Sequence, residues 1–329
     1  MTRLVPALLI VIAATAICRA TLLGSPAAAA QEQASRPDLQ GVWTNATLTP
    51  LERPARFAGR PFLTEAEAAE LESQAAQTFE QQAADRAGSA AAPRAGGNVG
   101  SYNQAVWSDS DRKVVATRQT SLVIDPPDGR VPVRPEAEQQ RDDMARRGTD
   151  SYEFFNVFDR CITRGVPGGF FPAPYNNAYQ IVQTPGYVII ASEMVHEARI
   201  IPTDGRPHRP DHLRTMTGDS VGRWEGDTLV VDTTNYNDKG SIATASTSGR
   251  MRGVPQSEAL HVVERFRRVD AGTISYTVTV DDPNVYTASW TVAMPLVRDD
   301  GYRIYEYACH EANYGVANIL RGARADEGR

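Results

Sequence analysis

The chain of 329 residues carries 34 basic and 40 acidic side chains, so its net charge is −6 at pH 7. This acidic balance argues against nucleic acid or an anionic lipid surface as partner, because both attract excess positive charge. The only lysines are Lys113 and Lys239, which argues against Schiff-base chemistry.

Residues 1–30 have the features of a cleaved signal peptide. Arg3 gives a short positive start, the run Leu4–Leu23 is mostly apolar, and three alanines at 28–30 suit a signal peptidase. A membrane anchor is the alternative, although no later segment reaches the roughly twenty apolar residues that a spanning helix needs. We therefore expect a periplasmic or secreted protein. Loss of Arg3 and Arg19, with no acid, would take the net charge from −6 to −8.

Export sets the redox context of the two cysteines that remain, Cys161 and Cys309. Thiols are oxidised outside the cytoplasm, which favours a disulfide between them. Two buried free thiols are the alternative.

Residues 31–104 are predicted to form an N-terminal extension with one helix. Thr64 and Glu67 stand at capping-box spacing, which predicts a helix start, and the helical composition continues to about Arg86. The Gly- and Ala-rich run 87–100 is typical of a flexible linker.

The main domain is predicted to span residues 105–329. Residues 120–133, TSLVIDPPDGRVPV, indicate a hairpin of two strands around a Pro-Pro-Asp-Gly turn. A helix is expected at Pro135–Arg147. Residues 165–177, GVPGGFFPAPYNN, predict a loop with two exposed aromatic side chains, either a pocket cover or a plain connector.

From residue 178 onward, polar and apolar residues alternate with the period of two that strands require. Short turns between the segments indicate antiparallel neighbours. The fold class is therefore mainly β: an up-and-down, lipocalin-like barrel or a strongly curved sheet, with a short helical N-terminal arm. A barrel has no exposed edges to protect; a two-sheet sandwich is the alternative. The predicted strands are 178–183, 187–201, 219–224, 228–233, 260–269, 273–281, 286–295 and 302–310.

The same alternation sorts the side chains of each strand onto an inner and an outer face. In segment 187–201 the even positions are the more apolar, so the even face is predicted to be inner, and Glu193, Glu197 and Arg199 to be outer. The even face is also the apolar one in the next three long strands. The chemically capable side chains predicted to face inward are His196, Glu264, Tyr276, Tyr286 and Trp290.

The segment 302–310 has two possible inner faces. Its even positions include Glu306 and His310, whereas its odd positions include Tyr305, Tyr307 and Cys309. The alternation alone leaves both choices open.

A carboxylate in an apolar interior must be paired, hydrogen-bonded or protonated. A His–Glu pair meets this need and is also an acid/base couple. We therefore expect cofactor-independent acid/base chemistry, by a lyase, isomerase or hydrolase, on a small, partly hydrophobic, oxygenated molecule. A periplasmic carrier for such a molecule is the alternative, and the polar groups would then only orient the ligand.

The roles follow from residue chemistry. His196 is the expected acid or base, with Glu264 or Glu306 as its partner and His310 or Tyr276 as a second proton donor. Arg160 is the expected anion clamp, or else a surface partner of Asp159. Tyr286 and Trp290 are expected to form the apolar wall.

Other chemistries find little support. His208 and His212 have a metal-like spacing, but Pro210 lies between them in an apparent loop, so no metal site is expected. The chain has no G-x-S-x-G elbow, phosphate-binding loop, dinucleotide fingerprint or c-type haem attachment sequence, so no cofactor is expected.

Several strings together resemble a family of secreted bacterial proteins of unknown function, and that resemblance carries no activity. DLQGVWTN, near the start of the mature chain, is also similar to the Gly-x-Trp opening of lipocalin-like barrels. The strings that carry the family resemblance are RCITRGVPGGFFP, HEARIIPTDGRPH, GRWEGDTLVVDTTNYN, VVERFRRVDAGTISYTVTVDDP, YEYACHEANYG and NILRGAR.

Overall fold

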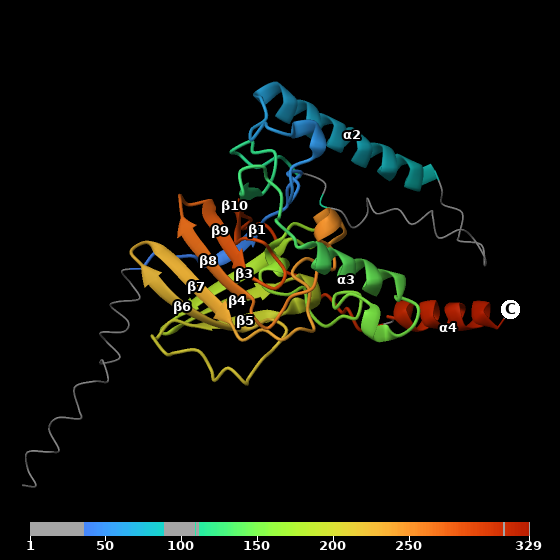
Figure 1. Cartoon of the computed structure of the whole chain (residues 1–329). Coiled ribbons are helices and arrows are strands. Elements are labelled where there is room, and N and C mark those ends of the chain that lie inside the picture. The colour runs from blue at the N-terminus through green and yellow to red at the C-terminus, as the bar shows by residue number, and fades with distance from the viewer. Residues whose placement is uncertain (1–35, 89–108, 110–111, 312, 329) are drawn as a thin grey trace, which may run out of the picture.

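The fold is a nearly closed antiparallel β barrel (Figure 1). The computed structural model describes residues 36–88, 109, 112–311 and 313–328, so the predicted signal peptide and almost all of the predicted linker lie outside the described residues. Nine strands follow one another around the sheet in the order β5-β4-β3-β1-β10-β9-β8-β7-β6, and β2 pairs with β10 beside this path. The predicted mainly β fold class is confirmed.

The strands and helices have the following bounds. The strands are β1 (Gly41–Thr44), β2 (Val123–Asp125), β3 (Ala178–Thr184), β4 (Tyr187–Ser192), β5 (Ala198–Pro202), β6 (Asp219–Glu225), β7 (Thr228–Thr234), β8 (His261–Arg268), β9 (Thr273–Asp281) and β10 (Trp290–Arg298). The α-helices are α2 (Glu65–Gly88), α3 (Pro135–Arg146) and α4 (Gly315–Glu327). Short 3-10 helices occupy Ala55–Phe57, Tyr152–Phe154, Gly168–Phe170, Met194–His196 and Ser246–Met251.

Both predicted helices form where their end signals stand. The Thr64 hydroxyl accepts the Glu67 N–H at 3.2 Å, and the Glu67 carboxylate accepts the Thr64 N–H at 2.9 Å, so the capping box is complete. The predicted domain boundary at residue 105 stays a prediction. The segment before it nevertheless supplies β1, which lies between β3 and β10 in the barrel sheet.

The barrel interior is filled by one side-chain face of each strand. As predicted, the even positions face inward in β8, β9 and β10, where Val262, Phe266, Val278 and Val292 are fully buried. Strands β5 and β6 end the sheet and do not pair with each other. They nonetheless come close, because a Cβ built on Gly222 of β6 would lie 3.0 Å from Ile201 Cγ2 of β5. The barrel therefore has one open seam.

The predicted strand 187–201 is wrong at its centre. A 3-10 turn at Met194–His196 divides it into β4 and β5, and Val195 and His196 both have a positive φ. This turn reverses the alternation. Even positions face inward in β4, whereas Arg199 and Ile201 pair with Ile190 and Val188 and face inward in β5. Arg199 was predicted to be outside and is inside.

Two further predicted β segments differ from the structure. Residues 120–133 form no hairpin: β2 pairs with β10, and the partner of Val133 is Tyr286 through an isolated bridge. Residues 302–310 form no strand and follow an irregular path over the surface. The choice between two inner faces therefore does not arise, because without a ladder no alternation is imposed.

The Gly-Pro loop at residues 165–177 folds into the end of the barrel instead of exposing its aromatic residues. Phe170 and Phe171 are buried. The Phe170 ring stacks on Tyr179 and Tyr276, with centroid separations of 4.5 and 4.9 Å. The prediction of exposed rings is wrong because the mouth of the barrel offers an apolar surface that only the assembled sheet creates.

Cys161 and Cys309 form the predicted disulfide, with Cα atoms 5.5 Å apart. It fastens the irregular C-terminal segment to the residues just before the Gly-Pro loop, across a sequence separation of 148 residues. Among the residues that the structure describes, no helix has the length and apolar character to cross a membrane.

The insertion of the Gly-Pro loop depends on Gly168. A Cβ built there would lie 2.2 Å from the carbonyl oxygen of Ile242, whereas one on Gly169 would meet its nearest neighbour, Arg164 Cβ, at 3.8 Å. We predict that Gly168→Ala lowers the free energy of unfolding by about 1–3 kcal/mol, because backbone must move to admit a methyl group. Gly169→Ala, the matched control, should change it by less than about 0.5 kcal/mol. Urea unfolding measures both, and equal effects would contradict the close approach of Gly168 to the Ile242 carbonyl.

Candidate functional site

The interior of the barrel contains a buried ionic cluster. Arg199 of β5 donates to both carboxylate oxygens of Glu264 of β8, with Nη1–Oε2 at 2.6 Å and Nη2–Oε1 at 3.0 Å. The Tyr276 hydroxyl of β9 donates to Glu264 Oε1 at 2.9 Å. Glu264 and Tyr276 are fully buried. The predicted inward positions of both are confirmed, but the partner of the carboxylate is an arginine instead of a histidine.

Strand register explains how these three groups meet. Glu264 lies opposite Val278 in the β8–β9 ladder, so Tyr276 is its diagonal neighbour on the same face. Arg199 lies on β5, at one end of the sheet. The reversed alternation of β5 turns its side chain inward, toward Glu264. A bidentate guanidinium–carboxylate contact is the strong form of such a pair, and it uses both oxygens of the carboxylate.

The electrostatics of the cluster stabilise the charged pair and keep the neighbouring phenols neutral. Burial, and then the Glu264 charge, raise the pKa of Tyr276 well above its ordinary value. The same two causes raise the pKa of Tyr236. For Arg199, burial lowers the pKa of the guanidinium, but the facing Glu264 carboxylate outweighs burial and the net direction is upward. Arg199 therefore stays cationic inside the barrel.

A cavity of about 350 Å³ lies at the open seam between β5 and β6, and Arg199 is one of its lining residues. Ala198, Ile200 and Pro202 of β5 and Val221 of β6 supply apolar wall. In the described chain, the facing edges of β5 and β6 pair with no other strand. A sheet edge of this kind leaves backbone N–H and C=O groups available to a ligand.

Two more arginines line the seam cavity from the connection between β5 and β6. Arg206 contacts Asp204, with Nη2–Oδ2 at 2.5 Å, and donates to the Tyr187 hydroxyl at 2.7 Å. Arg209 contacts Asp219, with Nε–Oδ1 at 2.6 Å. Three arginines thus line one concave surface where, among the described residues, Asp219 alone supplies a carboxylate. Such a wall can hold an anion or an oxygen-rich molecule.

His208 anchors this connection to the barrel. Its Nδ1 lies 3.1 Å from Asp219 Oδ2, and its Nε2 lies 3.1 Å from Asp232 Oδ1. His261 Nε2 contacts the same Asp232 carboxylate at 3.1 Å. Within the described ranges, no three potential ligand side chains are arranged to hold a metal ion. The geometry gives His208 a positioning role at the rim of the seam cavity.

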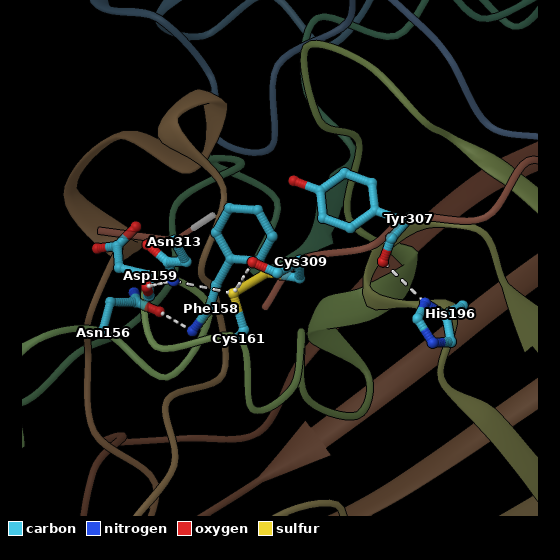
Figure 2. The surroundings of a disulfide bond; sticks show 8 residues. All are labelled: Asn156, Phe158, Asp159, Cys161, His196, Tyr307, Cys309 and Asn313. Carbon is cyan, nitrogen blue, oxygen red and sulfur yellow. Dashed lines mark hydrogen bonds between the residues drawn. A yellow bond between two sulfur atoms is a disulfide. The ribbon is translucent and has the colours of Figure 1, made fainter. Parts of the chain in front are cut away.

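His196 does not meet Glu264. Its ring is exposed, and its Nδ1 lies 2.8 Å from the Tyr307 carbonyl oxygen (Figure 2). The prediction that His196 faces the interior is wrong because the positive-φ turn at Val195 and His196 points the ring away from the barrel. Glu306 and His310 are exposed on the irregular C-terminal segment. The predicted His–Glu couple is therefore not assembled, and a catalytic role for these residues stays a prediction.

The remaining predicted site residues occupy two other places. Tyr286 and Trp290 are buried and pack edge to face, with ring centroids 5.5 Å apart, so they form core wall away from the seam. Arg160 lies outside the barrel, over the Tyr152 ring at 5.3 Å from its centroid, and lines a separate cavity.

The sequence analysis missed the three arginines of the candidate site, of which Arg199 alone belongs to the interior cluster. One signal pointed to it: a buried glutamate needs a cation, and arginine is the cation that pairs bidentately. The alternation had placed Arg199 outside, and only the turn at Val195 overrides that assignment.

Two other cavities, of about 270 and 490 Å³, lie beside α2. Their walls are mainly aliphatic and threonine side chains, and neither cavity reaches the interior cluster. The seam cavity is the better candidate because three arginines line it, and one of them, Arg199, belongs to that cluster.

Comparison of the chain with protein-family models, with curated proteins and with solved structures finds no match. Function is therefore argued from the geometry of the site.

The buried pair generates a stability prediction. Glu264→Gln should cost about 3–5 kcal/mol of unfolding free energy, because it leaves the Arg199 charge buried and unpaired. Arg199→Met should cost a similar amount, because it leaves the Glu264 carboxylate buried without its cation. The double variant should cost clearly less than the sum of the two, as residues in direct contact do. Urea unfolding of the four proteins measures the coupling, and additivity within about 0.5 kcal/mol would contradict it.

The raised pKa of Tyr276 predicts how stability depends on alkaline pH. The unfolded tyrosine ionises near pH 10 while the folded one keeps its proton, so the stabilisation is complete below pH 10 and is lost as pH rises further. Tyr276→Phe should flatten this decline by up to about 1.4 kcal/mol per pH unit. Tyr305 is exposed, and Tyr305→Phe is the matched control. Unfolding free energies between pH 9 and about 11 decide the matter, since identical slopes for the two variants would contradict a buried neutral phenol.

Proposed function

We propose that this protein is an exported small-molecule-binding protein whose ligand occupies the seam cavity between β5 and β6. The ligand class is a small, partly apolar molecule that carries a carboxylate or a similar oxyanion. A barrel fold with a disulfide is compatible with small-molecule binding outside the cytoplasm, where disulfides persist. The resemblance to secreted bacterial proteins agrees with this location.

The convergence of Arg199, Arg206 and Arg209 on one cavity carries the proposal. Arginine forks match carboxylate geometry, and each charge-assisted hydrogen bond formed in such a cleft contributes more than a neutral one. The cavity volume of about 350 Å³ is within the range of small-molecule sites. Apolar side chains of both strands would contact the uncharged part of the ligand.

Binding is preferred to acid/base catalysis because of how Glu264 is used. Both of its oxygens accept from Arg199, and one also accepts from Tyr276, so the carboxylate oxygens are already engaged by protein donors. Its effect is to fix the Arg199 guanidinium. A rigid cation beside a cavity loses little conformational entropy when an anion binds, which favours affinity.

The proposal predicts different effects for two arginines that resemble each other. Arg206 and Arg223 are each partly exposed and ion-paired with an acid two residues away, but only Arg206 lines the cavity. Arg206→Ala should weaken binding of benzoate about tenfold or more, the loss expected for one charge-assisted hydrogen bond of about 1.5–3 kcal/mol. Arg223→Ala should leave it unchanged. Calorimetric titration measures both.

Two controls sharpen this test. Benzamide has the shape of benzoate without the charge and should bind more weakly to the unmodified protein. Equal binding of the two, or equal losses in the two arginine variants, would contradict an anion site at the seam. The unmodified protein could also convert a bound molecule chemically. If His196→Ala abolished that conversion but kept the binding, the catalytic function would be favoured instead.

A further inference from the structure

A second cavity, of about 280 Å³, lies outside the barrel near the disulfide. Three segments enclose it. They are the C-terminal half of α3 together with Gly148, residues 153–160, and the stretch from Lys239 to Pro255. Met144, Phe154 and Phe155 give it an apolar wall. It shares no lining residue with the seam cavity.

The wall of this cavity has an excess of positive charge. Four cations and two carboxylates, those of Glu153 and Asp159, line it. Arg252 contacts Asp159 at 3.3 Å and Arg141 contacts Asp142 at 2.8 Å. Within the described part of the chain, Arg160 and Lys239 pair with no carboxylate. Lys239 is exposed at the rim, and Arg160 lies over the Tyr152 ring, so an entering anion would displace no carboxylate from either cation.

Two buried polar atoms in the same wall have no hydrogen-bond partner among the described residues, Asn156 Nδ2 and Ser241 Oγ. Ser241 is only 7% exposed. Asn156 is held by its other end, because its Oδ1 accepts the Phe158 N–H at 2.9 Å (Figure 2). A buried hydrogen-bond donor without an acceptor costs about 1–3 kcal/mol of folding free energy. Both of these donors lie in the wall that also contains Arg160 and Lys239.

We propose that this cavity is a second binding site, for a small molecule that joins an oxyanion to an apolar or aromatic group. The oxyanion, a carboxylate or a phosphate, lies between Arg160 and Lys239 and accepts hydrogen bonds from Asn156 and Ser241. The apolar group lies against Phe154, Phe155 and Met144. Arg160 is thus an anion clamp, as expected from its residue type. It serves this second cavity, whereas the sequence analysis had placed it at the barrel site. The site is independent of the ligand proposed for the seam.

The local electrostatics agree with an anion here. Burial raises the pKa of Asp159, and Arg252 only partly offsets that effect, so the one partly buried acid of the cavity binds a proton more readily than usual. Protonation of Asp159 on lowering the pH would remove a negative charge from the wall and strengthen anion binding.

Calorimetric titration with benzoate, phenyl phosphate and inorganic phosphate tests the site. All titrations use the Arg206→Ala protein, in which the seam should bind about tenfold more weakly and contribute little. Arg160→Gln/Lys239→Gln should weaken binding of the better aromatic anion at least about tenfold. Arg146→Gln/Arg223→Gln changes net charge equally at exposed positions that line neither cavity, and should have little effect. The relative affinities of benzoate and phenyl phosphate identify the preferred oxyanion.

Ser241→Ala separates a ligand-binding role from a structural one. Removal of an unpartnered buried hydroxyl should leave the free energy of unfolding unchanged or slightly higher, while binding weakens several-fold. Destabilisation with unchanged binding overturns the role of Ser241. The second site itself is overturned if both double variants bind alike, if Arg206→Ala alone abolishes all binding, or if none of the three anions binds saturably.

Discussion

The bidentate contact between Arg199 and Glu264 is the interaction on which the rest of the barrel depends. Arg199 lies on β5, one end of the sheet, and Glu264 lies on β8, near the other end. No backbone ladder joins β5 to β6, so this side-chain contact crosses the interior where the sheet itself stops. It gives a fully buried carboxylate two hydrogen bonds among apolar neighbours, and it fixes Arg199, a residue that lines the seam cavity.

The loops complete what the sheet leaves open. The Gly-Pro loop places Phe170 between Tyr179 and Tyr276 at the barrel end, and Gly168 permits the close approach to Ile242. The disulfide then ties residues 302–310 to Cys161, just before this loop, although they belong to no strand. Burial of aromatic surface and one covalent link thus fix segments that have no regular hydrogen bonding of their own.

The two candidate binding sites differ in how their cations are held. At the seam, each arginine already has a carboxylate partner, so the guanidinium groups are positioned before a ligand arrives. Beside the disulfide, Arg160 and Lys239 have no such partner in the described chain, and two buried donors lack acceptors. The first arrangement favours a preformed site with modest charge excess, whereas the second has more electrostatic energy to gain when an anion binds.

Local patterns in the sequence determined the elements: the capping box of α2, the period-two strands, the inward positions of Glu264 and Tyr276, and the cysteine pair. Each depends on residues close in the chain or on the redox chemistry of two thiols. Only the tertiary structure decided that Arg199 faces inward, that His196 does not, and that Phe170 is buried. Two positive-φ residues reverse the alternation of β5, and the apolar mouth that takes up Phe170 exists only once strands distant in sequence have paired. The candidate sites belong to this second group, because a cavity is a property of several segments together.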